Sequence, residues 1–203
     1  SLSLVACTAG MAHADDVIED GSWQVTVNSG FMGVMEMVLE FDEDGDTITA
    51  HGDPRTARSM ARLTARTGRP HPDWNARNGI AHLQLAAGTD SDFSGVLTTP
   101  FGDSPVSLTF TDRTHFTGTL GSGSPVNGEF GARLPVRDYR PIADALVAAM
   151  QARVYDPSRL ETRQWRAFAD KLYALAELAE DDLTFFSGVH LAWDDAVFSH
   201  FRL

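Results

Sequence analysis

The stretch FMGVMEMVLEFDEDGDTITA, residues 31–50, carries the pattern that decides the fold of the N-terminal part of the chain. An apolar run over residues 31–41 is followed by an acidic segment with one glycine, Gly45, and then by the strand-like residues 47–50. An Asp-Gly pair between two such runs is a strong hairpin signal, because the turn needs positive φ at its centre. We therefore predict two antiparallel strands joined by a tight turn.

Signals of the same kind recur on both sides of this hairpin. Residues 23–27 alternate apolar and polar side chains, which indicates a half-buried strand. A segment rich in Pro and Gly, residues 100–105, is expected to break the chain before the next strand. Five further short strands are predicted from alternation and flanking turn residues: 80–85, 93–98, 106–110, 115–120 and 127–134. About eight short strands at this spacing predict an antiparallel β-barrel or meander over residues 16–135.

The composition changes near residue 135. Residues 138–198 contain few β-branched residues and one glycine, Gly188. A helix is predicted to begin at Pro141, with four residues sharing one apolar face: Ile142, Leu146, Ala149 and Met150. The fold class predicted for the chain is therefore α+β, with the β-rich domain followed by a helical part over residues 138–203.

Two more helices follow in the sequence. Thr162 is in position to cap a helix over residues 163–180, along which five large or small apolar residues recur at helical spacing: Trp165, Phe168, Leu172, Leu175 and Ala179. The pair Asp181-Asp182 is in position to cap a third helix over residues 183–197, with Phe186, His190 and Trp193 on one side. Three helices with short joints predict a small three-helix bundle.

The first 14 residues resemble an export signal. The tripeptide Ala12-His13-Ala14 matches the A-x-A pattern of signal peptidase sites. Residues 4–7, ending in Cys7, resemble a bacterial lipobox, in which case Cys7 would carry a lipid anchor. Either reading predicts an exported protein, whether periplasmic, an outer-membrane lipoprotein or extracellular. Both leave no cysteine for a disulfide or a zinc site.

The charge of the chain excludes one class of partner. The formal net charge is −12, with the acidic residues spread along the sequence. A phosphate backbone requires a cationic surface, so nucleic acid is not an expected partner. One exception is a stripe of arginines at helical spacing, Arg55, Arg58, Arg62, Arg66 and Arg69. It is interpreted as the solvated face of a surface helix, and docking of an acidic partner is the alternative.

No metal or cofactor is predicted. The alternating acids Asp42, Asp44 and Asp46 invite a calcium reading, but an EF-hand loop needs glycine at its sixth position, where Thr47 stands. The histidines lack metal-binding spacing, and His82 and His115 are expected to be half-exposed strand residues. The sequence contains neither a G-x-S-x-G elbow nor a Gly-rich phosphate loop that opens a helix.

The C-terminal third carries a family resemblance. Tyr155-Asp156-Pro157, residues 165–168, Asp181-Asp182 and the run Phe198-Ser199-His200-Phe201-x-Leu203 resemble the helical segment before the core of S41-family (tail-specific, tricorn-like) serine peptidases. The resemblance implies that His200 is the general base and Ser199 its orienting hydroxyl. The nucleophile would come from a later core. The chain begins at Ser1 and ends at an aromatic run, so we expect a fragment that is inactive alone and cleaves polypeptides only in the full-length protein.

The start of the β-rich part resembles a second family. Gly21-x-Trp23 matches the G-x-W of the first strand in lipocalin-like barrels. This resemblance implies an alternative function, the binding of a small apolar ligand inside the barrel.

Overall fold

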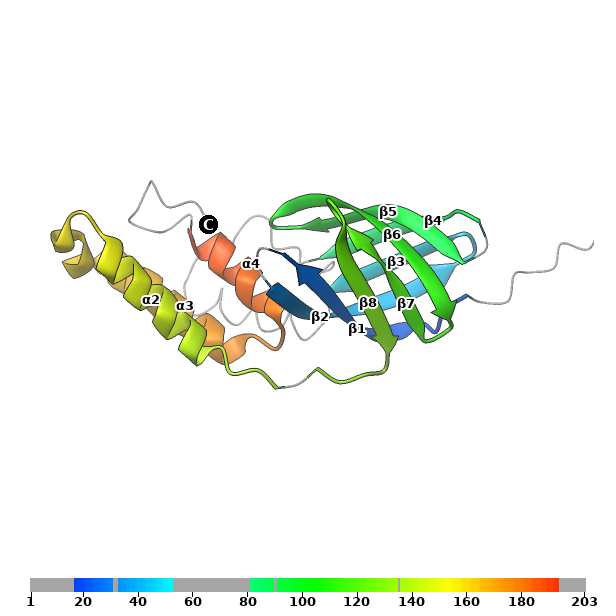
Figure 1. Ribbon diagram of the computed structural model, residues 1–203. Coiled ribbons are helices and arrows are strands. Elements are labelled where there is room, and N and C mark those ends of the chain that lie inside the picture. Colours follow the sequence, from blue (N-terminus) through cyan, green and yellow to red (C-terminus); the bar gives the residue numbers. More distant parts are fainter. Residues whose placement is uncertain (1–16, 31–32, 53–80, 90, 135, 194–203) are drawn as a thin grey trace, which may run out of the picture.

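The computed structural model describes residues 17–30, 33–52, 81–89, 91–134 and 136–193. Over these ranges eight strands come first, and three α-helices with one 3-10 turn follow. Figure 1 shows the strands as a barrel and the helices as a separate body at one end of it, with α4 next to the barrel. The prediction of an antiparallel barrel followed by a small helical bundle is confirmed.

The strands form one closed barrel in which each pairs with the next and β8 pairs back onto β1, all antiparallel. Apolar side chains alternate inward along them, as expected for a sheet with one face in the core. The strands are β1 (Gly21–Ser29), β2 (Gly33–Asp44), β3 (Thr47–Gly52), β4 (His82–Ala87), β5 (Asp92–Thr99), β6 (Gly102–Asp112), β7 (His115–Leu120) and β8 (Ser124–Phe130).

The β2–β3 hairpin forms where the sequence predicts it. Asp44 pairs with Thr47, so the two turn residues are Gly45 and Asp46. Gly45 has φ +61°, a conformation that other L-residues adopt at a cost. The acidic segment is thus the end of a hairpin, as the sequence indicated.

The largest differences from the predicted strand boundaries are in β6 and β8. β6 begins at Gly102 and includes Pro105, although residues 100–105 were expected to break the chain. The Pro105 carbonyl faces β7 and accepts from the Gly121 N–H, and the β6–β7 ladder begins only at the next residue. The missing Pro105 N–H therefore lies beyond that ladder and removes no strand-pair hydrogen bond. β8 is also earlier than predicted, at Ser124–Phe130 instead of residues 127–134.

Trp23 is the centre of the barrel core. Its ring is fully buried, stacks on Phe116 at 5.4 Å between centroids, and lies within 5.9 Å of three more rings, those of Phe41, Phe110 and Phe130. Its Nε1 donates to the Glu19 carbonyl, which satisfies the one polar atom of the indole.

The chain before β1 closes the barrel at the β2–β3 hairpin end. Ile18 is 1% exposed and belongs to the barrel core. The N–H groups of Val17 and Ile18 donate to the two carboxylate oxygens of Glu43, at 3.1 and 2.9 Å. The opposite end of the barrel is left for the helices.

The helices follow the predicted order. They are α2 (Arg140–Arg153), the 3-10 turn η1 (Pro157–Glu161), α3 (Arg163–Leu178) and α4 (Asp182–Trp193). The Thr162 hydroxyl accepts from the Trp165 N–H, so the predicted cap of α3 is confirmed. On α2 the predicted face is partly wrong: Ala149 is exposed, while Ala143 and Val147 are buried, because the buried stripe runs through positions 143, 147 and 150.

The bundle has its own core. Trp165, Phe168, Leu172 and Leu175 of α3 are buried against α2 and α4, as their spacing indicated. Among the described helices, none combines the length and the apolar character needed to cross a bilayer.

Candidate functional site

The two residues nominated as catalytic, Ser199 and His200, lie outside the described residues. Cys7, the signal-like residues 1–14 and the arginine stripe of residues 55–69 also lie outside them. The described part of the chain ends at Trp193, in α4, shortly before Ser199. The site that can be built from coordinates is therefore the junction that holds α4.

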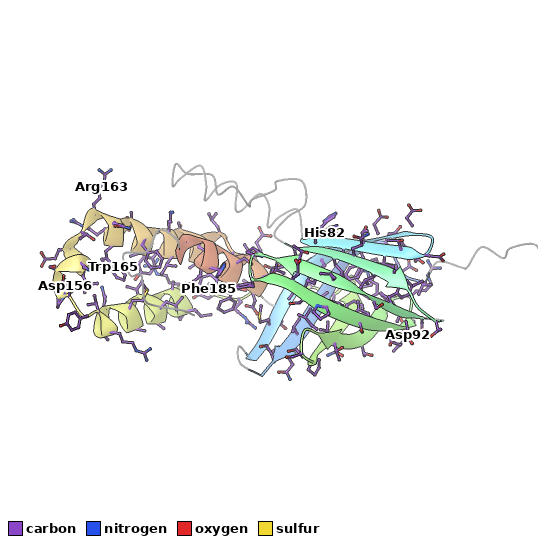
Figure 2. The ribbon with its side chains drawn as sticks, turned by 90° about the horizontal axis from the view of Figure 1, so that it is seen from above. His82, Asp92, Asp156, Arg163, Trp165 and Phe185 are labelled. Atoms are coloured by element: carbon purple, nitrogen blue, oxygen red, sulfur yellow. The ribbon has the colours of Figure 1, made fainter. Side chains whose placement is uncertain are left out.

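Helix α4 belongs to both hydrophobic cores. Leu183, in its first turn, is 2% exposed and packs in the barrel core. Phe185 and Val189 are buried in the bundle core, and Phe186 packs against both. Figure 2 shows Phe185 close to the barrel and Trp165 farther along the bundle. Most described side chains of α4 are buried, and the barrel on one side and the other helices on the other side cover it.

The residues Asp181 and Asp182, at the start of α4, bind the main chain of β2. β3 pairs with β2 only over Leu39–Asp44, so the first half of β2 has no strand on that side. The N–H of Glu36 donates to Asp182 Oδ2 at 2.8 Å, and the N–H of Val38 donates to Asp181 Oδ2 at 3.1 Å. Alternate residues of a strand present their N–H groups on the same side, which is why two neighbouring carboxylates can bind both. The two acids thus satisfy part of the open edge.

Asp181 also has the local role that the sequence predicted. Its Oδ1 accepts from the N–H of Thr184 at 2.7 Å and from the Thr184 hydroxyl. It therefore caps α4 with one oxygen and binds β2 with the other, and its side chain fixes the direction in which the helix leaves the strand.

Asp182 is the buried centre of an ionic network whose other charged members, Arg137 and Glu36, are partly exposed. Arg137, just before α2, donates from Nη1 to both carboxylate oxygens, at 2.8 and 2.7 Å, and from Nη2 to Glu36 Oε2 at 3.1 Å. The Tyr139 hydroxyl donates to Asp182 Oδ1 at 2.9 Å. Burial, and then the neighbouring Asp182 charge, raise the pKa of Tyr139 above its ordinary range, so the phenol remains a donor. A carboxylate that is 1% exposed is stable here because these donors compensate its charge.

Sequence reasoning missed this network. It assigned Asp181-Asp182 to helix capping alone, whereas their β2 partners lie more than a hundred residues earlier in the chain. The one available signal was that two adjacent acids, more than a cap requires, precede a helix rich in apolar residues.

One described histidine resembles part of a catalytic triad. His115 Nδ1 lies 2.9 Å from the Thr114 hydroxyl and 3.0 Å from Asp112 Oδ1, on the β6–β7 turn. A triad needs the hydroxyl and the carboxylate on different ring nitrogens, and here both meet Nδ1. The hydrogen bonds from Thr114 lower the pKa of Asp112 to about 2, and the whole group is exposed. It is a turn-stabilising cluster. As expected, His82 and His115 are surface residues of strands.

The barrel interior is filled by its own side chains. The cavity that remains is about 20 Å³, enough for about one water molecule. Only apolar side chains line it, among them Val25, Leu39, Leu83 and Phe116. Within the described ranges, no three His, Cys, Asp or Glu side chains gather in a way that could hold a metal ion.

Comparison with known proteins yields a few structures. No family model and no curated protein matches the chain. A redesigned β-barrel, b11L5F_LGL, aligns over 54% of this chain and 86% of its own length, with 18% identity and a TM-score of 0.33. A second redesigned barrel, mFAP1 bound to DFHBI, aligns over 54% and 90%, with 17% identity and a TM-score of 0.35.

Proposed function

We propose that this chain is the non-catalytic N-terminal region of an exported S41-like serine peptidase, with polypeptides as the substrate of the full-length protein. The observation that carries the proposal is the run Phe198-Ser199-His200-Phe201-x-Leu203, which follows the helical part of the chain. On this proposal His200 takes the proton of a serine supplied by a later core, and Ser199 orients its imidazole. A serine hydroxyl is a poor nucleophile until such a base removes its proton.

Several residues of the resemblance have structural roles that support the proposal. Asp156 caps η1 through the Ser158 N–H at 3.1 Å, Trp165 and Phe168 are core residues of α3, and Asp181-Asp182 hold α4. Figure 2 shows Asp156 at the end of the bundle far from the barrel.

The described residues contain no serine that is paired with a histidine. Each described histidine, His51, His82, His115 and His190, lacks a hydrogen bond to a serine hydroxyl in this part of the chain. The proposal therefore requires the fragment to be inactive, and it assigns cleavage to the longer protein.

The experiment is cleavage of a fluorogenic peptide by the full-length protein. We expect His200→Ala to abolish turnover and Ser199→Ala to reduce it. His82→Ala is the matched control, since His82 is an exposed strand residue, and it should leave turnover unchanged. Full activity of the His200→Ala protein would refute the assignment.

Binding of a small apolar ligand inside the barrel is the second candidate. The apolar lining of the interior favours it. Pockets for such ligands usually measure about 300–1,000 Å³, so the side chains would have to move to admit one. Saturable binding of a fluorescent apolar probe to residues 1–203, lost when Leu83 is replaced by Gln, would favour this function. We expect no saturable binding.

A further inference from the structure

We propose that Asp181 and Asp182 are positioning residues. They fix α4 to the β-barrel and thereby hold the point from which the chain continues into the peptidase core. The inference rests on the proposed function, because it assigns the general base, His200, to the chain that leaves α4. It gives the barrel a role in the reaction: setting the place and direction from which that chain departs.

The first anchor is the hydrogen bonding at the N-terminal end of α4. Two carboxylates on adjacent residues accept from two N–H groups of one strand, Glu36 and Val38. Two such bonds to a strand inside a closed barrel fix both the position and the rotation of the first helical turn. Arg137 Nη1 lies between the two Asp182 oxygens and restricts the carboxylate as well.

The second anchor is apolar. Leu183 is buried in the barrel core at the end opposite Ile18, and Phe186 packs against that core one turn later. Hydrogen bonds set the direction of α4, and this burial opposes its withdrawal from the barrel.

The third anchor lies near the other end of the helix. The ring of His190 lies 5.1 Å from that of Phe101, in the turn between β5 and β6. α4 therefore contacts the barrel both at its first turn, on β2, and near its last turn, on the β5–β6 side. This ring contact lies at the surface, since Phe101 is 48% exposed and His190 is exposed, so it is weaker than the two buried anchors at the N-terminal end of this 12-residue helix.

The consequence for the reaction is geometric. A general base works only when it lies within hydrogen-bonding distance of the proton it removes, and a misplacement of about 1 Å can cost about a hundredfold in rate. Loosening the α4 anchor should therefore lower kcat more than it raises KM, since substrate binding would depend mainly on the core.

The experiment uses the full-length protein with Asp181→Asn and Asp182→Asn, which keep the shape of the side chain and remove its charge. We expect kcat to fall about ten- to a hundredfold while KM stays within about twofold. Thr162→Ala is the matched control, because it removes the cap of α3 and destabilises the bundle without touching the α4–barrel contacts. At a temperature where all variants are folded, it should keep a near-normal kcat.

Hydrogen exchange of the 1–203 chain gives a readout that does not depend on activity. Both Asn variants should speed exchange of the α4 amides and leave those of β5 and β6 protected. Unchanged α4 exchange, or an unchanged kcat beside an inactive His200→Ala protein, would overturn the positioning role and leave the proposed function standing. An active His200→Ala protein would overturn both, because no base would remain to be positioned.

Discussion

Adding a single methyl group at Gly95 on β5 should strongly lower the stability of the barrel. It pairs with Leu85 of β4, and the two strands approach closely at this point. A Cβ added at Gly95 would overlap the main-chain oxygen of Gln84, and it would lie 2.8 Å from that residue's carbonyl carbon and 3.0 Å from Leu85 Cα. All three atoms belong to backbone, which has no rotamer to change.

The size of the effect follows from these distances. Carbon atoms in contact lie about 3.5–4.0 Å apart, so the contact with the Gln84 carbonyl carbon alone would push the strands apart by about 0.7 Å, and relief of the overlap with the Gln84 oxygen needs a larger shift. Overpacking of this kind costs about 1–3 kcal/mol, and each weakened ladder hydrogen bond adds about 1 kcal/mol. We expect a loss of about 3 kcal/mol, which lowers Tm by about 6–12 °C in a chain of this size.

The assay is thermal unfolding followed by Trp fluorescence and by circular dichroism. Gly30→Ala is the matched control, because no atom lies within 4 Å of a Cβ added there. Its Tm should stay within about 2 °C of the wild type. If Gly95→Ala also melted within that range, the close approach of β4 and β5 would be refuted.

Three further predictions concern other parts of the molecule. Leu183→Ala should cost about 2–5 kcal/mol and shift the unfolding of barrel and helices together, which urea denaturation followed by fluorescence and far-UV circular dichroism would show; a shift in only one signal would contradict the shared role of α4. Ser187→Ala should stabilise the protein by about 1 kcal/mol, because the buried hydroxyl has no partner among the described residues, and a lower Tm would contradict this. The Thr114 hydrogen bonds lower the pKa of Asp112 to about 2, so the stability that they contribute is present above about pH 4 and is lost as the pH falls toward 2. Asp112→Asn should therefore lower Tm at pH 7, and its difference from the wild type should shrink at pH 2; a difference that does not depend on pH would contradict this.

The barrel could be predicted from sequence because its signals are local. Alternation and turn residues mark each strand, and an up-and-down barrel pairs each strand with its neighbour in sequence. The predicted break at residues 100–105 is correct for the turn at 100–101 and wrong for residues 102–105, where Pro105 is a local signal for a break but lies in β6. Whether Pro105 interrupts a strand depends on which side its missing N–H faces, and the position of β7 decides that. Boundaries of this kind need the pairing before they can be assigned.

The contact between α4 and the barrel could not be predicted in the same way, because an aspartate that caps a helix looks the same in sequence as one that also accepts hydrogen bonds from the edge of a strand. Asp181 caps its helix, so the local prediction is correct. No residue near Asp181 in the sequence indicates that it also binds a second partner, the N–H of Val38. What the sequence does contain is a helix rich in apolar residues after two acids, and such a helix is expected to be largely buried. Those acids need donors that their own helix cannot supply in full, and β2 has free N–H groups only where β3 stops pairing with it. The half of β2 that β3 does not pair offers N–H donors, and the two acids at the start of α4 offer carboxylate acceptors. The hydrogen bonds between them join the helical part to the barrel.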